Sequence, residues 1–295
     1  MSPRLQRGSA VVLAMLVLAT ATTLIIGTLW QQSALIRETE NERAYAQARW
    51  LLRGAIDWAG VILREDARTT NVDHRGEPWA VPLADTRLNE SDGRPAAYLA
   101  GSIDDEQAKF NLRNLLAGTD LNGGELQALR RLLGALRIEE RLADKIGERL
   151  LAAQKARSSE PAIGLAYVDD LLQVGLQPEQ VQRLKGFVTI LPEPTPLNVN
   201  TASAEVLVAR IAGLELTDAR RIVAARDRAY FKDMGDALAR LREAVPSVAD
   251  TGLAVTTRYF SVEGMVSYGP ARLAAHALVR REPVTLEVLW MKEAG

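Results

Sequence analysis

The sequence contains no cysteine and only two histidines among its 295 residues. Without thiols the chain can form no disulfide bond, no zinc–thiolate site and no cysteine nucleophile. The histidines, His74 and His276, are too widely separated in sequence to indicate a histidine-based metal site, and each is expected to be an ordinary surface or strand residue. Motifs of serine hydrolases, zinc peptidases, P-loop nucleotidases and dinucleotide-binding enzymes are also missing. We therefore expect a protein without enzymatic activity.

An excess of charge of either sign is missing too. Lysine and arginine total 36 and aspartate and glutamate total 37, which gives a formal net charge of −1. A chain with this balance has no overall positive field that would attract nucleic acid or anionic lipid. Hydrophobic residues make up 47% of the sequence, as in globular proteins with a core. The length fits one large domain or two smaller ones.

Ionisable side chains are absent from residues 8–36. Residues 9–30 are long enough to cross the roughly 30 Å hydrocarbon layer of a bilayer as a helix. Because Arg4 and Arg7 precede this run, the short N-terminus is expected to stay in the cytoplasm while the bulk of the chain crosses. A secretory signal is one alternative, but its cleavage site would be residues 19–21, in the middle of the apolar run. An ordinary single-span membrane protein is another.

Proline is missing from the residues that follow the apolar run, up to about residue 66, and glycine occurs there only at Gly54 and Gly60. Apolar residues recur at intervals of three and four, which predicts an amphipathic helix. A helix over residues 9–66 would be about 87 Å long. Such continuity suits a helix that packs on copies of itself and then on a globular head. The predicted packing stripe consists of Tyr45, Ala48, Leu52, Ala55, Ala59 and Ile62.

The tripeptide Arg7-Gly8-Ser9, between a short basic leader and the long apolar helix, resembles the leader of type IV pilins and type II secretion pseudopilins. The resemblance implies that a prepilin peptidase of the membrane cleaves between Gly8 and Ser9 and that Ser9 is then N-methylated. Glycine suits the position before the cut because it has no Cβ and fits an extended, closely held peptide.

Leu13 departs from the usual pattern of that family, because the fifth residue after the cut is Glu in most members. A carboxylate at that depth in a membrane is costly unless it is paired. In the family it is thought to pair with the N-terminal ammonium of a neighbouring subunit. K-type minor pseudopilins (general secretion pathway protein K) characteristically lack this Glu, and the sequence resembles them. A subunit at the tip has nothing above it to pair with, so the missing charge agrees with that position.

The rest of the chain predicts an α+β fold, with a pilin-like long N-terminal helix packed on a small antiparallel sheet. Residues 256–266, 271–281 and 284–291 alternate apolar and polar side chains between turn signals, which predicts a three-stranded antiparallel meander. Loops with one or two short strands are expected after the helix, where proline, glycine, asparagine and aspartate are frequent.

The region before the meander has helical spacing and predicts a large all-α domain inserted ahead of the C-terminal strands. The predicted helices are 125–136, 141–156, 168–174, 178–187, 204–212, 217–227 and 234–241. Such an insert is characteristic of the K-type family, and residues 104–115 resemble the segment that leads into it. The predicted parts are a leader (1–8), a transmembrane and assembly helix (9–35), a head (36–112 and 253–295) and a helical domain (113–252) whose halves are joined near 191–197.

A competing motif lies in residues 197–227, which resemble a helix-hairpin-helix DNA-binding module. The DNA-binding version needs a Gly-hydrophobic-Gly turn whose amides approach a phosphate, whereas here Glu215 follows Gly213 and Leu214. We expect no nucleic acid partner, and keep a membrane-anchored DNA-binding protein as the alternative function. The basic residues that could contact a nucleic acid backbone are Arg220, Arg221, Arg226 and Arg228.

Two acidic groups are candidate calcium ligands, because calcium takes several oxygen ligands from loops. Relatives of the family are known to bind calcium in the head, so a structural calcium is the one cofactor that the resemblance implies. The alternative is that these carboxylates are solvated and hydrogen-bonded within local turns. The candidates are Asp85, Asn89, Glu90 and Asp92 in one group and Asp104, Asp105 and Glu106 in the other.

The resemblance implies a minor pseudopilin at the tip of the type II secretion pseudopilus. There it would initiate or cap assembly for the export of folded proteins across the outer membrane. Its partners would be the prepilin peptidase, the membrane, the pseudopilus and two other minor pseudopilins in a heterotrimeric tip complex. It would be a single-pass protein of the inner membrane, with most of the chain in the periplasm.

Overall fold

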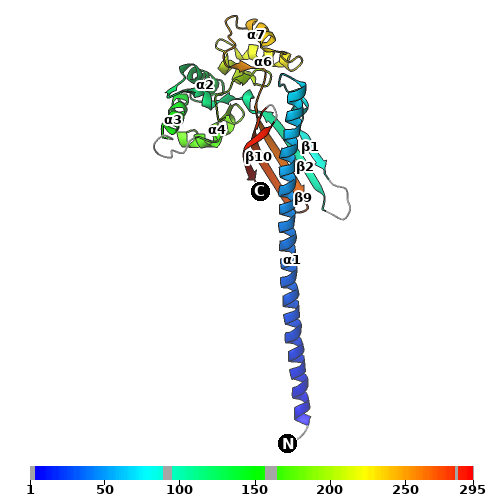
Figure 1. Cartoon of the computed structure of the whole chain (residues 1–295). Coiled ribbons are helices and arrows are strands. Elements are labelled where there is room, and N and C mark those ends of the chain that lie inside the picture. Colours follow the sequence, from blue (N-terminus) through cyan, green and yellow to red (C-terminus); the bar gives the residue numbers. More distant parts are fainter. Residues whose placement is uncertain (1–3, 89–94, 157–164, 283–284, 295) are drawn as a thin grey trace.

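A single helix, α1 (Arg4–Thr69), begins the chain and extends far beyond the rest of the molecule (Figure 1). The structure is a computed structural model that describes residues 4–88, 95–156, 165–282 and 285–294. With 66 residues, α1 is about 99 Å long. Threonines in its apolar half donate their hydroxyls to carbonyls three or four residues earlier, as Thr22 does to Leu18 at 2.8 Å. These side chains therefore need no water to satisfy them.

The upper part of α1 packs on a five-stranded antiparallel sheet with the strand order β1-β2-β9-β10-β11. The strands are β1 (Leu83–Arg87), β2 (Ala97–Asp105), β9 (Tyr259–Tyr268), β10 (Ala271–Arg281) and β11 (Leu286–Ala294). The last three strands confirm the predicted meander. Gly101 of β2 is required by its neighbour, because a Cβ there would lie 2.5 Å from the Glu263 carbonyl oxygen on β9.

The stripe of α1 that faces the sheet differs in part from the predicted one. Ala48, Leu52 and Ala59 are buried as predicted, and Ala55 and Ile62 are half-buried. Tyr45 is 45% exposed, so its assignment to the packing stripe is wrong for this chain's own core. The helix period places the preceding residue, Ala44, against the sheet instead. The buried residues of α1 that contribute to the core are Ala44, Ala48, Leu52, Ile56, Ala59 and Leu63.

A helical domain is inserted between β2 and β9, which are adjacent strands of the sheet. In Figure 1, α2, α3 and α4 lie in one group, and α6 and α7 lie in another, at the end of the molecule far from the N-terminus. Side-chain caps begin several helices, as Asn122 does for α2 and Ser203 for α5. The helices are α2 (Gly123–Ala135), α3 (Leu142–Ala156), α4 (Pro178–Leu184), α5 (Ala204–Arg210), α6 (Leu216–Arg226) and α7 (Met234–Arg242).

Short elements connect the head and the two groups of helices. One segment predicted as a helix, η4 (Val168–Val174), has the 3-10 form. The other 3-10 segments are η1 (Pro78–Ala80), η2 (Glu106–Ala108) and η3 (Leu112–Leu115). Paired short strands are β3 (Phe110–Asn111) with β6 (Val188–Thr189), β4 (Leu116–Ala117) with β5 (Asp120–Leu121), and β7 (Leu197–Asn198) with β8 (Leu253–Ala254).

Two main hydrophobic cores hold the described residues together. One joins α1 to the sheet, with Leu52, Trp79, Phe260 and Val266 among its buried members. The other runs through the helical domain from Phe110 to Val255. The proline-rich stretch between the two halves is packed, because Asn114 Nδ2 donates to the Thr195 carbonyl at 2.8 Å and Leu197 is buried. The domain boundaries at residues 113 and 252 stay a prediction.

Candidate functional site

Between Ala10 and Arg43, α1 makes no contact that buries its side chains. Every described side chain from Ala10 to Arg43 is exposed, and Trp30 reaches 77% exposure. Among the described helices, α1 is the one that is long and apolar enough to cross a membrane. Leu13 is 67% exposed on this helix. Gly8 and Ser9 belong to α1 as well, and their side chains lie outside the described residues.

The outward face of α1 beside the head is also apolar. Trp50, Trp58 and Val61 are 70%, 51% and 50% exposed, although they lie beside a folded sheet. Gly54 lies between the two tryptophans, and a Cβ added there would meet nothing within 4 Å. These four positions are spaced by four, four and three residues and therefore share one face of the helix. We name Trp50, Gly54, Trp58 and Val61 the outward face. An exposed apolar surface of this kind typically marks a contact with another molecule.

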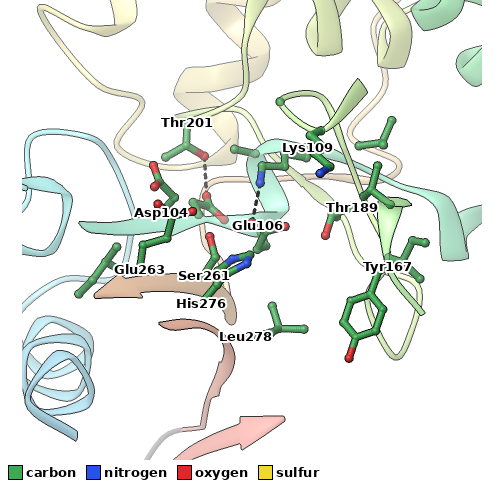
Figure 2. Close-up of a pocket in the computed structure, with 18 of the residues that line it drawn as sticks. Asp104, Glu106, Lys109, Tyr167, Thr189, Thr201, Ser261, Glu263, His276 and Leu278 are labelled. Carbon is green, nitrogen blue, oxygen red and sulfur yellow. Dashed lines mark hydrogen bonds and ion pairs between the residues drawn. The ribbon is translucent and has the colours of Figure 1, made fainter. Parts of the chain in front are cut away.

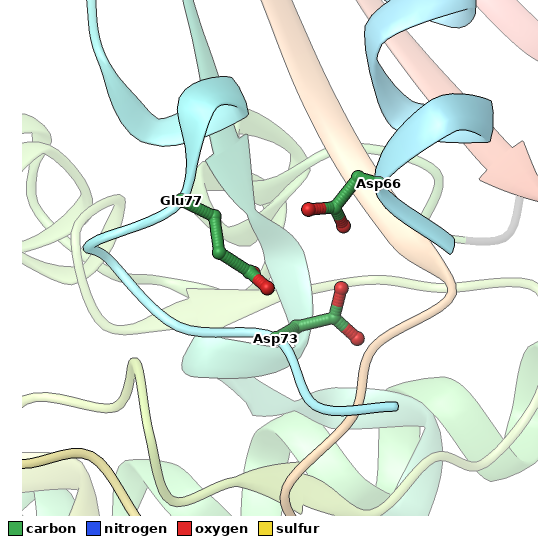
Figure 3. A group of neighbouring side chains, drawn as sticks. All are labelled: Asp66, Asp73 and Glu77. Carbon is green, nitrogen blue, oxygen red and sulfur yellow. The ribbon is translucent and has the colours of Figure 1, made fainter. Parts of the chain in front are cut away.

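Three buried carboxylates meet where α1 ends above the sheet (Figure 3). Asp66, Asp73 and Glu77 have carboxylate oxygens within 4.8 Å of one another. Asp66 belongs to the last turns of α1, and the other two belong to the loop that follows. Sequence reasoning missed this group, because three acids spaced by seven and four residues around a helix end have no recognisable pattern.

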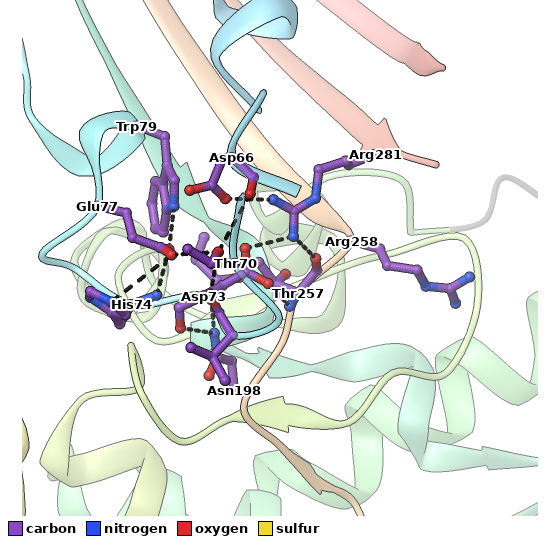
Figure 4. A network of polar contacts seen from close by, with 12 residues as sticks. Asp66, Thr70, Asp73, His74, Glu77, Trp79, Asn198, Thr257, Arg258 and Arg281 are labelled. Atoms are coloured by element: carbon purple, nitrogen blue, oxygen red, sulfur yellow. Dashed lines mark hydrogen bonds and ion pairs between the residues drawn. The ribbon is translucent and has the colours of Figure 1, made fainter. Parts of the chain in front are cut away.

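Arg281, at the end of β10, supplies the cation for two of these carboxylates (Figure 4). Its Nη1 donates to Asp66 Oδ2 at 2.9 Å and its Nη2 to Asp73 Oδ1 at 2.5 Å. The guanidinium also lies over the Phe260 ring, 4.9 Å from its centre. The helix end, the loop and the sheet are thus held by one buried arginine.

Glu77 is satisfied by neutral donors. Its carboxylate accepts hydrogen bonds from Trp79 Nε1 at 2.8 Å, from Thr70 Oγ1 at 2.8 Å and from the His74 backbone N–H at 2.9 Å. The His74 ring stacks on Tyr230 with ring centres 3.7 Å apart. His74 is therefore a loop residue that connects the head to the helical domain, and His276 lies on β10.

Burial in this group favours protonated carboxyls. Desolvation raises the pKa of Asp66 to about 7, with further upward contributions from the charges of Glu77 and Asp73. Arg281 opposes that shift only in part. Desolvation also raises the pKa of Asp73.

The same network continues into the helical domain through Asn198 and Asp105. The Asn198 Nδ2 donates to the Asp73 carbonyl at 3.1 Å and to Asp105 Oδ2 at 2.9 Å. Asp105 Oδ2 also accepts from Thr201 Oγ1 at 2.5 Å. Burial raises the pKa of Asp105 to about 6, although these hydrogen bonds lower it. This buried chain of contacts joins α1, the sheet and the second half of the helical domain.

The predicted calcium ligands do not converge. Asp104 is exposed, whereas Asp105 and Glu106 are buried and point to different partners. Glu106 pairs with Lys109, 2.6 Å from Nζ, while Asp105 joins the network above. Strand alternation and the start of η2 send these consecutive side chains apart, so 104–106 do not form one set of calcium ligands. Asp66, Asp73 and Glu77 are the group of three acids that the described residues do bring together, and Arg281 is their cation.

The second predicted acidic group is not assembled by the described residues. Asp85 is exposed on the edge strand β1. Asn89, Glu90 and Asp92 lie outside the described residues. A calcium site in this region stays a prediction.

The helix-hairpin-helix segment is α5, a turn at Gly213 and α6. Gly213 has φ of +85°, which explains why a glycine stands in this turn. Arg226 is 3% exposed and donates to the carbonyls of Val199 and Ala202, at 2.8 and 2.6 Å. It is therefore a buried packing residue, and its assignment as a candidate nucleic acid contact is wrong.

The other basic residues of this segment are at the surface and partly neutralised. Arg221 pairs with Asp218 within α6. Arg220 lies 3.9 Å from a carboxylate oxygen of Glu205. The surface of the hairpin thus offers few unpaired positive charges to a phosphate backbone, and the segment serves as part of the helical core.

Comparisons with known proteins point to one family. A family model described as "Type II secretion system (T2SS), protein K" matches residues 197–256. The chain is 30% identical over 302 residues to type II secretion system protein K of Pseudomonas aeruginosa, covering 94% of this chain and 89% of that protein. It is 25% identical over 316 residues to type II secretion system protein K of Klebsiella pneumoniae, covering 96% and 95%.

A similar fold occurs in the crystal structure of the GspK-GspI-GspJ complex from the type 2 secretion system of enterotoxigenic Escherichia coli. The superposition has a TM-score of 0.67 with 22% sequence identity, and it covers 88% of this chain and 99% of the matched chain.

Proposed function

Because this chain belongs to the type II secretion system protein K family of minor pseudopilins, we propose that it occupies the tip of the pseudopilus. At the tip it initiates or caps assembly for the export of folded proteins across the outer membrane. The observation that carries this proposal is the placement of the helical domain. The domain is inserted between adjacent strands of the sheet and lies over the end of the head far from the N-terminus of α1 (Figure 1).

A domain in this place would obstruct the addition of a further subunit above the head. The pseudopilus would grow from the membrane side, where the apolar half of α1 is fully exposed along its length. Leu13 supports the same position, because it offers no carboxylate for the ammonium of another subunit. The head with its inserted domain would thus form the tip of the filament, and α1 would contact the subunits on the membrane side.

The partners that we propose are other minor pseudopilins, bound along α1. In the solved complex the named components are GspK, GspI and GspJ. The exposed apolar half of α1 and the outward face provide two surfaces for neighbouring helices, on either side of the charged stretch 37–43. Burying apolar side chains contributes about 25 cal/mol per Å² of surface removed from water, which favours helix packing beside the head. Within the membrane, close packing of the helices takes over that role.

We also propose that the chain is anchored in the inner membrane with its head in the periplasm. Arg4 and Arg7 would keep the N-terminus cytoplasmic, and the prepilin peptidase would cut between Gly8 and Ser9 and methylate Ser9. The intact mass of the chain, made with and without the peptidase, tests this step. A chain that begins at Met1 or Ser2 in both cases would contradict it.

The tip proposal is tested by replacing residues 113–252 with a short Gly/Ser linker. We expect longer or more numerous pseudopili in cells that overproduce the major subunit, because the obstruction above the head is gone. The control variant retains the helical domain and carries the same Gly/Ser linker as an insertion at the junction between the head and that domain. Filaments of unchanged length and number, with the shortened chain present at normal level in the membrane, would rule out the steric role.

A further inference from the structure

A cavity of about 640 Å³ lies between the sheet and the helical domain (Figure 2). Its floor is the face of the sheet turned away from α1, because Ser261 and Glu263 alternate along β9 with Phe260 and Val262, which belong to the core under α1. The volume falls within the range of about 300–1,000 Å³ that is typical of ligand sites. The helical domain covers this face without filling the space above it.

The floor is polar, unlike the face under α1. Cross-strand pairing aligns Glu263, His276 and Lys292 in one row over β9, β10 and β11. The next row consists of Asp104, Ser261, Leu278 and Trp290, from β2 to β11. The carboxylates therefore gather at the β2–β9 side, and the aromatic and basic groups gather at the β10–β11 side.

The basic groups of the lining already have partners within the chain. The contacts are Lys109 Nζ with Glu106 at 2.6 Å, Lys185 Nζ with Asp169 at 2.7 Å, Lys292 Nζ over the Tyr167 ring at 3.0 Å and Arg75 Nη2 with the Thr201 carbonyl at 3.0 Å. None of these four cations pairs with Asp104 or Glu263 among the described residues. His276, which lies opposite Glu263 across the strands, sets its ring edge to face against Trp290 with ring centres 5.1 Å apart.

The two acids of the floor form no ion pair within the part of the chain that the structure describes. Asp104 and Glu263 are exposed to the cavity and have no hydrogen-bond or ion-pair partner among the residues that the structure describes. Asp104 pairs across the strands with Ser261, two residues from Glu263. Diagonal neighbours of this kind are separated by about 7–8 Å, a distance at which two carboxylates can bind one cationic group between them.

We propose that this cavity binds a lysine or arginine side chain, presented by a segment of another protein. Asp104 and Glu263 receive the cation through charge-assisted hydrogen bonds. Trp290 and Tyr167, whose rings meet edge to face with centres 5.3 Å apart, form the wall that contacts the rest of the segment. A calcium ion fits less well, because two carboxylates supply few of the six to eight oxygen ligands that calcium takes.

The test is a binding titration with the full chain in detergent at low salt. The probe is a six-residue peptide of alternating glycine and arginine, and its glycine–glutamate counterpart is the negative control. We expect saturable binding of the basic peptide and none of the acidic one. The double variant Asp104→Asn/Glu263→Gln should weaken binding at least tenfold. The matched control is Glu179→Gln/Glu243→Gln, which removes two exposed acids with no described partner from the helical domain.

Three results would overturn the proposal. The first is no saturable binding of the basic peptide to the unaltered chain. The second is an equal loss in both double variants, which would show attraction to the overall charge rather than to the cavity. The third is tight calcium binding that the Asp104→Asn/Glu263→Gln variant loses and that displaces the peptide, which would make this a metal site. None of these readouts requires pseudopilus assembly, so they are independent of the proposed tip function.

Discussion

Burial in the folded chain favours the neutral, protonated form of the Asp66 carboxyl. Its pKa is raised to about 7, compared with about 3.9 in an unfolded chain. Between these two values the folded state binds more protons than the unfolded state does. The free energy of unfolding therefore falls as the pH rises from about 4 to about 7, and the contribution of Asp66 is lost above that window.

The Asp66→Asn variant should remove this part of the pH dependence. The free energy of unfolding in urea should be higher at pH 5 than at pH 8 for the unaltered chain. In the variant this difference between the two pH values should be smaller, by on the order of 3 kcal/mol. Asp57→Asn is the matched control, because Asp57 is an exposed acid of the same helix. Parallel pH profiles for the unaltered chain and Asp66→Asn would show that the proton is not held at this residue.

Leu13 offers a second prediction for a single residue. In a tip subunit a carboxylate at this position would have no ammonium above it, so Leu13→Glu should cost on the order of 2–3 kcal/mol within the membrane. We expect less Leu13→Glu chain than unaltered chain to co-purify with the partner subunits. The uncharged variant Leu13→Gln should retain more of this binding than Leu13→Glu does. If Leu13→Glu instead appears along the length of the filament, this chain is not confined to the tip.

At the scale of elements, the outward face of α1 can be tested without disturbing the fold. Gly54→Leu replaces a glycine in an exposed helix, at a position where an added Cβ meets no neighbouring atom within 4 Å. It should therefore stabilise the isolated chain by roughly 0.8 kcal/mol while filling the gap between Trp50 and Trp58. Binding to partner subunits should fall at the same time, as measured by co-purification and thermal unfolding.

The control for this variant is Gly123→Leu, the same change at an exposed glycine with open space at the start of α2. It should leave partner binding unchanged. Undiminished partner binding by Gly54→Leu would show that neighbouring helices use another face of α1.

The regular elements were predictable because their signals are local. The absence of proline and the apolar intervals predicted α1 to within a few residues, and alternation predicted the last three strands. The stripe error at Tyr45 arose because positions 44 and 45 are both apolar and only the packed sheet decides between them. The group around Asp66 was not predictable, because Arg281 is 215 residues away in sequence and neither side chain belongs to a motif. The cavity was not predictable either, because it depends on how the helical domain packs on the sheet, although each of these parts was predictable by itself.

At the scale of the whole molecule, Asn198 helps to fix the helical domain on the head. Asn198→Leu would leave the Asp73 carbonyl without its described donor and would take one of several donors from Asp105, which keeps Thr201. A buried group that is left unsatisfied costs about 1–3 kcal/mol. We expect weaker resistance to urea and faster proteolysis between head and helical domain. Asn71→Leu, at an exposed loop position, is the control. A domain connection as resistant as in the unaltered chain would show that the core contacts alone hold it.

The insertion between β2 and β9 also sets an order of events during biogenesis. Ala97 on β2 pairs with Tyr268 on β9, so this seam of the sheet closes only after the intervening helical domain has been made. Closing a loop of that length is slow, and helices with local contacts form sooner. A chain cut short before β9 would leave Leu52 and its neighbours on α1 without the β9–β11 part of their cover. The final strands are therefore needed before the surface against which α1 rests is complete.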